Sequence, residues 1–189
     1  MLLIAGFSLT AAAHGPIDGY LKVNPAASDI NWVGKKVTGQ HNGSIAIKEG
    51  TLQFKKGALI GGNFTIDMTS IKVLDLQGSS AGKLEGHLKS DDFFGTGSFP
   101  TATLIILDAK DKGKGNFDVK ANLTIKGITK PVEFPVTLSP NGKGYKATAN
   151  ITIDRSQYEV KYGSGKFFDN LGDKTIYDDF ELTVALVTE

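Results

Sequence analysis

The sequence contains no cysteine, which excludes disulfide frameworks, thiol chemistry and thiolate metal sites. An excess of charge of one sign is also lacking, because 21 basic residues stand against 20 acidic ones and the formal net charge is +1. Such a balance offers no electrostatic footprint for nucleic acid. No Lys/Arg cluster is present that would hold the chain to an anionic membrane surface. The length of 189 residues suits a single domain.

Histidine is scarce, and the three histidines are His14, His41 and His87. They form no His-x-x-x-His pair and no cysteine could complete a ligand set, so we expect no metal site. The segment 78–82, GSSAG, matches the G-x-S-x-G motif of hydrolases, but that motif requires an Asp and then a His later in the chain. Only His87 follows, within the same predicted helix. We interpret the serines as helix caps and expect a non-enzymatic protein with no catalytic residue and no cofactor.

Residues 1–13 differ from the rest of the chain. They are apolar and end in three alanines, which is typical of a signal-peptide core and cleavage site, although the basic start is missing. The apolar run is too short to span a membrane, so we expect no stable membrane insertion. We predict cleavage near Ala13–His14 and a periplasmic or secreted location. The alternative is that these residues form a first strand or a buried helix.

Apolar and polar residues alternate through most of residues 20–189, as in strands with one buried face. The clearest row is Phe117, Val119, Ala121, Leu123 and Ile125. Antiparallel sheets with one solvated face have this pattern, and closure into a barrel removes exposed edges. The sequence therefore predicts an all-β fold: one antiparallel, eight-stranded barrel domain over residues 20–189. We also expect a turn-rich link at 39–43 and a tight hairpin connection at Glu49–Gly50.

One short helix is predicted, over about residues 82–90, near one mouth of the barrel. Leu84 and Leu88 share a face of this helix, since they are four residues apart. The helix leads into the aromatic pair Phe93–Phe94. We predict that this segment is a plug or lid over the open end of the barrel.

An eight-stranded barrel is either filled by its own side chains or holds one small ligand. The row 117–125 would span about 30 Å at about 3.3 Å per residue, a length that suits an extended lipid chain. The apolar candidates for contact with the ligand are Trp32, Phe64, Ile66, Met68, Leu84, Leu88, Phe93, Phe94, Phe99, Leu123, Phe134, Ile153 and Phe180.

Polar residues near the mouth are the candidates for recognising a head group, and they are His41, Asp67 and His87. One buried polar partner discriminates between ligands far more strongly than an apolar wall does. Arg155 follows an apolar row, and we expect it to pair with Asp67 or Asp154.

Several ordered motifs resemble the YceI-like family. They are DDFF at 91–94, FPTAT at 99–103, NLTIKGITKPV at 122–132 and ANITIDRS at 149–156. The chain departs from the usual pattern of the family at 95–98 and at 157–159. The resemblance implies a periplasmic, polyisoprenoid-binding, lipocalin-like barrel that carries, transports or stores an amphiphile such as an isoprenoid quinone, a polyprenyl phosphate or a fatty-acid amide.

Two alternatives stay open on the sequence alone. A barrel with a fully packed core would act in stress response or interaction through a protein partner. An enzyme acting on a lipid-like substrate would need an acid–base pair beside the cavity, and the sequence offers no clear one. Many small barrels form homodimers, and the sequence is compatible with a homodimer without predicting one.

Overall fold

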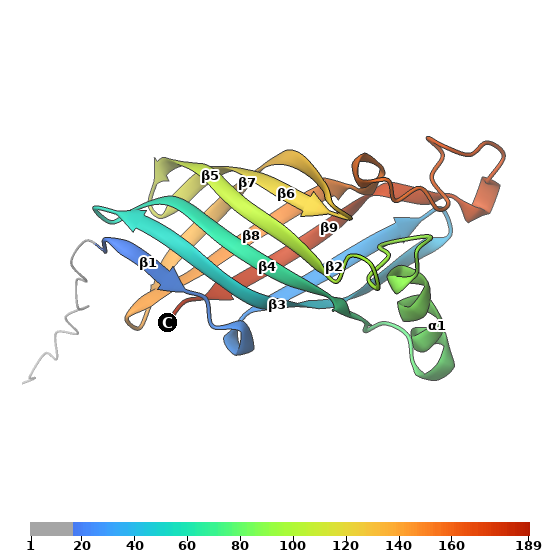
Figure 1. Ribbon diagram of the computed structural model, residues 1–189, viewed down its shortest axis with the longest axis horizontal. Helices are drawn as coiled ribbons and strands as arrows, with labels where there is room; N and C mark the ends of the chain where they lie inside the picture. Colours follow the sequence, from blue (N-terminus) through green and yellow to red (C-terminus); the bar gives the residue numbers. More distant parts are fainter. Residues whose placement is uncertain (1–16) are drawn as a thin grey trace, which may run out of the picture.

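Nine β-strands and one α-helix make up most of the described part of the chain, which in this computed structural model is residues 17–189 (Figure 1). The strands are β1 (Gly19–Lys22), β2 (Asp29–Lys36), β3 (Gly39–Lys55), β4 (Ala58–Val73), β5 (Thr101–Gly113), β6 (Asn116–Ile125), β7 (Ile128–Asn141), β8 (Gly144–Asp154) and β9 (Ile176–Val187). The helix is α1 (Gly78–Lys89), and the short 3-10 helices are η1 (Pro25–Ala27), η2 (Arg155–Tyr158) and η3 (Gly172–Lys174). The signal-peptide prediction for residues 1–13 lies outside the described residues.

Eight of these strands close into a barrel. Hydrogen-bonded neighbours follow the order β3, β2, β9, β8, β7, β6, β5 and β4, and β4 pairs with β3 again. Every pairing is antiparallel. This topology confirms the predicted eight-stranded antiparallel barrel with one short helix. The additional strand β1 pairs with β3 beyond the stretch of β3 that pairs with β2.

The two ends of the barrel are built differently (Figure 1). The first, which we call the α1 end, carries α1, the segment 90–100 and the connection 155–175 between β8 and β9. The opposite, hairpin end carries the short β3–β4, β5–β6 and β7–β8 turns. There the Phe54 ring stacks on Tyr145, with 5.1 Å between ring centroids. This aromatic pair belongs to the packed core at the hairpin end.

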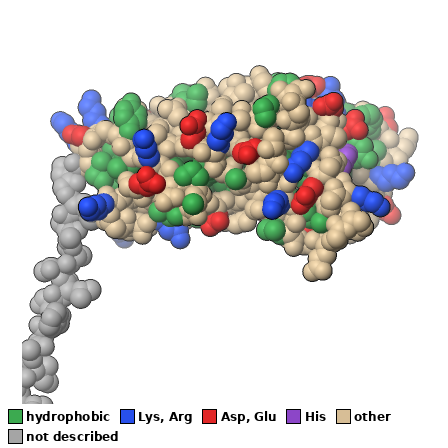
Figure 2. All heavy atoms as spheres, turned by 60° about the horizontal axis from the view of Figure 1, so that its bottom comes forward, with side chains coloured by type: hydrophobic (Ala, Val, Ile, Leu, Met, Phe, Trp, Pro, Cys, Tyr) green, Lys and Arg blue, Asp and Glu red, His purple; other side chains and the backbone are tan. Residues whose placement is uncertain are grey.

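Alternation along β6 places one row of side chains in the core, as predicted. Phe117, Val119, Ala121, Leu123 and Ile125 are each at most 6% exposed. The residues between them point outward, and Lys120 forms an exposed ion pair with Glu133 on β7. Basic and acidic side chains are interspersed over the face shown in Figure 2, in keeping with the nearly neutral composition.

The predicted turns at 39–43 and at Glu49–Gly50 are wrong, because both segments lie within β3, a single strand of 17 residues. Residues 39–43 pair with β2. Glu49 and Gly50 lie within the β3–β4 pairing, next to an irregularity in its register. A Cβ at Gly50 would lie 2.7 Å from the Phe64 ring, so close packing requires glycine there. The chain reverses instead at residues 56–57, both of which have positive φ.

The helix begins earlier than predicted. It spans Gly78–Lys89, and its N-cap residue Gln77 makes no side-chain capping hydrogen bond. The serines expected to cap the helix lie inside its first turn. Because α1 lacks capping side chains and contains glycines that disfavour helices, its stability depends on packing against β4.

Candidate ligand-binding cavity

A cavity of about 200 Å³ lies inside the barrel. All eight barrel strands contribute to its wall, and nearly all the lining side chains are apolar. Some of these side chains point into the barrel and are nevertheless only partly buried: Trp32, Ile45, Ile66, Leu104, Phe180, Leu182 and Val184. The barrel interior is therefore not completely filled by its own side chains.

This unfilled volume is energetically costly for the protein alone. At about 24 cal/mol per Å³ of cavity, about 200 Å³ corresponds to roughly 5 kcal/mol relative to a packed core. The largely apolar lining offers water few hydrogen-bond partners. An apolar molecule that entered the barrel would recover much of the missing contact energy.

The α1 end covers the cavity with side chains from the predicted plug segment. Leu88, Phe93 and Phe94 all line the cavity. The rings of Phe93 and Phe94 meet edge to face at 5.0 Å, and Phe94 meets Phe180 in the same way at 6.3 Å. Lys126, in the β6–β7 turn, donates a hydrogen bond of 2.8 Å to the Phe93 carbonyl oxygen. This bond ties the plug segment to the rim of the barrel.

The structure brings most of the predicted apolar contact residues together. The cavity is lined by Trp32, Phe64, Ile66, Met68, Leu88, Phe93, Phe94, Leu123, Phe134, Ile153 and Phe180. The two remaining candidates, Leu84 and Phe99, are not in this lining. Leu84 is a half-buried residue of α1, and Phe99 is 37% exposed at the surface.

The head-group candidates His41 and Asp67 lie away from the cavity wall. His41 Nδ1 is 2.8 Å from Asp75 Oδ2, and the other oxygen of that carboxylate accepts a hydrogen bond from the Asn42 amide. Asp67 accepts hydrogen bonds from the hydroxyl and amide of Thr69, and the hydroxyl bond in particular lowers the pKa of Asp67. Both side chains are occupied by local hydrogen bonds.

His87 lies one layer behind the cavity. Its ring meets Phe93 at 5.5 Å and Tyr162 at 4.3 Å between centroids, edge to face in both cases. Its Nε2 atom is buried and has no hydrogen-bond partner among residues 17–189. His87 thus joins α1 to the β8–β9 connection through ring packing.

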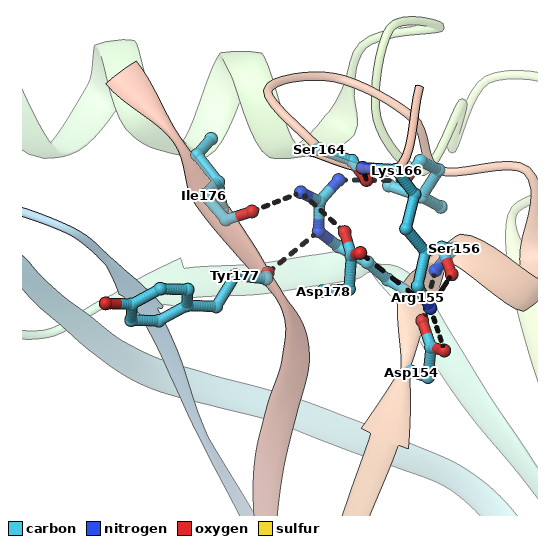
Figure 3. A network of polar contacts seen from close by, with 9 residues as sticks. Asp154, Arg155, Ser156, Ser164, Lys166, Ile176, Tyr177 and Asp178 are labelled. Carbon is cyan, nitrogen blue, oxygen red and sulfur yellow. Dashed lines mark hydrogen bonds and ion pairs between the residues drawn. The ribbon is translucent and has the colours of Figure 1, made fainter. Parts of the chain in front are cut away.

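Two charged residues line the cavity, the exposed Asp179 and Arg155, which is 2% exposed. Its guanidinium donates hydrogen bonds to the carbonyl oxygens of Val160, Ile176 and Tyr177 at 2.8, 3.0 and 3.2 Å. It also lies 3.4 Å from Asp178 Oδ1 and 5.3 Å from the centroid of the Phe93 ring. Figure 3 shows this network, with the Tyr177 ring pointing away from it.

The expected pairing of Arg155 with Asp67 or Asp154 is wrong, because Asp178 is its partner. Asp154 instead pairs with Lys166 at 2.7 Å (Figure 3). Arg155 continues the inward-facing row 147–153 of β8, which is a sequence signal for its burial. The position of Asp178 depends on the β8–β9 pairing, which the sequence does not reveal.

The site is suited to binding a molecule that is apolar where it is enclosed. Arg155 is paired with Asp178, and the second charged residue of the lining, Asp179, is exposed to solvent. Within residues 17–189, no group of three or more His, Cys, Asp or Glu side chains is placed to hold a metal ion. No helix among these residues is long and apolar enough to cross a membrane.

Comparison with known proteins matches the chain to a protein family. The model of the YceI-like domain matches residues 21–188. A UPF0312 protein of Shewanella oneidensis is 28% identical over 109 residues, which are 54% of this chain and 54% of that protein. A UPF0312 protein of Vibrio vulnificus is 35% identical over 79 residues, 38% of this chain and 42% of the relative. The matched stretch thus spans about half the length of these relatives or less.

Solved structures share the fold. The crystal structure of Burkholderia cenocepacia BcnA matches with a TM-score of 0.70 and 23% identity, over 87% of this chain and 98% of that one. A polyisoprenoid-binding domain from Saccharophagus degradans, implicated in plant cell wall breakdown, matches with a TM-score of 0.66 and 14% identity, over 92% and 99% of the two chains. These similarities agree with the closed barrel described above.

Proposed function

The chain belongs to the family of YceI-like domains, and we propose that it binds the apolar part of a long-chain amphiphilic lipid inside its barrel without catalysing a reaction. The observation that carries this proposal is the unfilled apolar cavity of about 200 Å³. The polyisoprenoid-binding domain among its structural neighbours supports the same class of ligand. We further propose that the protein transports or stores this lipid in the periplasm or outside the cell.

The volume of the cavity limits how much of the ligand is enclosed. An engineered apolar cavity of about 150 Å³ holds one benzene molecule, so at the same ratio about 200 Å³ holds roughly eight carbon atoms. Each buried CH₂ group contributes about 0.8 kcal/mol before the costs of binding. A polyisoprenoid, an isoprenoid quinone or a fatty-acid amide would therefore insert one apolar end and leave the remainder outside, unless the barrel widens.

Charge supports the same orientation of the ligand. The charged residues of the lining are Arg155, which Asp178 already neutralises, and the exposed carboxylate of Asp179, which would repel an anion. An anionic head group drawn to Arg155 would have to displace carbonyl oxygens and a carboxylate. We therefore propose that the apolar end enters first and that the head group stays near the α1 end.

A homodimer remains a proposal as well. Apolar side chains are exposed on the outer wall of neighbouring strands, with Ile60 on β4 and Ile105 and Leu107 on β5 at 38%, 44% and 58% exposure. A second copy of the chain would cover them. Light scattering on the wild type and on a variant with these three residues changed to Ser tests this pairing.

The function is tested by solvent extraction of the purified protein followed by mass spectrometry for lipids. We expect one amphiphile in a fixed ratio to protein. An empty extract, together with no binding of the neutral fluorescent probe N-phenyl-1-naphthylamine, would contradict the proposal and favour a protein partner instead.

A pair of variants on β8 shows whether binding takes place inside the barrel. Ala149 lines the cavity, whereas Thr152 is exposed on the outer face of the same strand. Ala149→Leu should fill part of the cavity and lower probe binding at least tenfold. Thr152→Leu adds similar apolar bulk outside and should leave probe binding within twofold of the wild type. Equal binding by both variants would place the ligand elsewhere.

A further inference from the structure

The barrel wall is irregular where β2 meets β9, near the α1 end. Gly34 pairs with Phe180, and the next paired residues are Lys36 and Ile176. Residue 35 of β2 therefore lies opposite residues 177–179 of β9. The wall bulges at this point and lacks one-to-one pairing between the two strands.

Gly34 faces into the barrel at this irregularity. It alternates with Ile30 and Trp32 along β2, and all three line the cavity. No heavy atom outside its immediate chain neighbours lies within 4 Å of the position that a Cβ at Gly34 would take. Two other wall glycines are crowded: a Cβ would lie 1.8 Å from the nearest atom at Gly43 and 2.8 Å at Gly62. Since Gly34 does not have positive φ, its backbone does not require glycine, and its effect is to leave space.

The cavity reaches the surface beside this space. Gly34, Ile176 and Tyr177 all belong to its lining, and Tyr177 is 51% exposed. The half-buried rings of Phe94 and Phe180 lie on the inner side, 6.3 Å apart. From the inside to the outside, the wall therefore presents the apolar interior, then the space left by Gly34, then the exposed ring of Tyr177.

We propose that the ligand enters and leaves through a lateral portal between β2 and β9, with Gly34 at its inner side and Tyr177 at its outer rim. This inference rests on the proposed function and adds a route to it. It also accounts for a cavity that encloses only part of a long chain, because the remainder passes out through the same portal.

A residue at the rim of a portal changes the rates of entry and exit together and leaves the affinity unchanged. We expect Tyr177→Ala to raise the association and dissociation rate constants of N-phenyl-1-naphthylamine at least threefold each, with Kd within twofold of the wild type. Phe168→Ala is the matched control, because Phe168 is 49% exposed in the connection between β8 and β9 and does not line the cavity. Unchanged rates in Tyr177→Ala, or a change in Kd alone, would overturn the portal.

Thiol labelling tests the portal without any ligand, because the wild-type chain contains no cysteine. Gly34→Cys and Ala147→Cys each place one thiol on the cavity wall, the first at the proposed portal and the second near the hairpin end. N-ethylmaleimide should label Gly34→Cys at least tenfold faster. Equal labelling rates would refute an opening at Gly34. Failure of the wild type to bind the probe would instead refute the proposed function, and labelling would still decide whether the portal exists.

Discussion

Replacing Arg155 with Ala should reveal how much the buried network at the α1 end contributes to stability. The change removes three hydrogen bonds to carbonyl oxygens and leaves the Asp178 carboxylate, 16% exposed, with Lys166 at 3.8 Å as its remaining cation. Removing one partner of a buried ion pair typically costs about 3–5 kcal/mol. Water reaches part of Asp178 and Lys166 stays close to it, so we expect the free energy of unfolding to fall by about 3 kcal/mol, the lower end of that range.

Urea unfolding measures this loss, followed by the fluorescence of Trp32, the single tryptophan, and by far-UV circular dichroism. The matched control is Lys120→Ala, which breaks the ion pair between Lys120 and Glu133. Both side chains of this pair are exposed, at 62% and 69%. Exposed pairs contribute about 0–1 kcal/mol. If Arg155→Ala costs no more than Lys120→Ala, the argument from burial is wrong. The double variant Arg155→Ala/Asp178→Asn should lose less than the sum of the single variants, since it leaves no unpaired charge.

Two further predictions concern the same end of the barrel. Burial alone would raise the pKa of Asp154, but hydrogen bonds from Lys166 and Ser156 lower it to about 2. The ionised Asp154 carboxylate therefore stabilises the fold above about pH 4, the pKa in the unfolded chain, and this stabilisation is lost as the pH falls toward 2. Lys166→Met should raise the titration midpoint of the Asp154 carboxyl in carbon NMR and shift acid unfolding to higher pH. An unchanged midpoint would argue against the Lys166 contact. Phe94→Ala should weaken ligand retention, measured as occupancy in native mass spectrometry, more than it weakens folding, measured as the melting temperature. Phe99 lies away from the cavity, so Phe99→Ala should leave the occupancy unchanged. Equal occupancy in the two variants would count against a lid.

The fold could be predicted because alternation is a local signal. A strand with one buried face can be recognised from the alternation of a few consecutive residues, and the row from Phe117 to Ile125 is buried as expected. Glycine carries no such unique signal. Gly50 was expected in a turn and lies in a strand under the Phe64 ring, because a turn and a close approach both require a missing side chain.

The candidate site could be predicted only in part, for a related reason. Apolar residues on the inward rows line the cavity whichever strands are neighbours, so eleven of the thirteen apolar candidates lie in its lining. Polar contacts depend on which strands meet. Asp178 reaches Arg155 because β9 lies beside β8 in the sheet, and His41 contacts Asp75, 34 residues away. Motifs and spacing do not contain these pairings.

Arg155 links the stability of the barrel to the proposed portal. An opening in a sheet leaves backbone groups without partners, and such groups are costly when buried. In the bulge, the guanidinium binds the carbonyl oxygens of Ile176 and Tyr177. The wall can therefore depart from regular pairing beside Gly34 without leaving these carbonyls unsatisfied. If this reasoning holds, a folded Arg155 variant should also label faster at Gly34→Cys, because the strand that forms the rim would lose its anchor. A stable variant with an unchanged labelling rate would separate the two roles and assign Arg155 to stability alone.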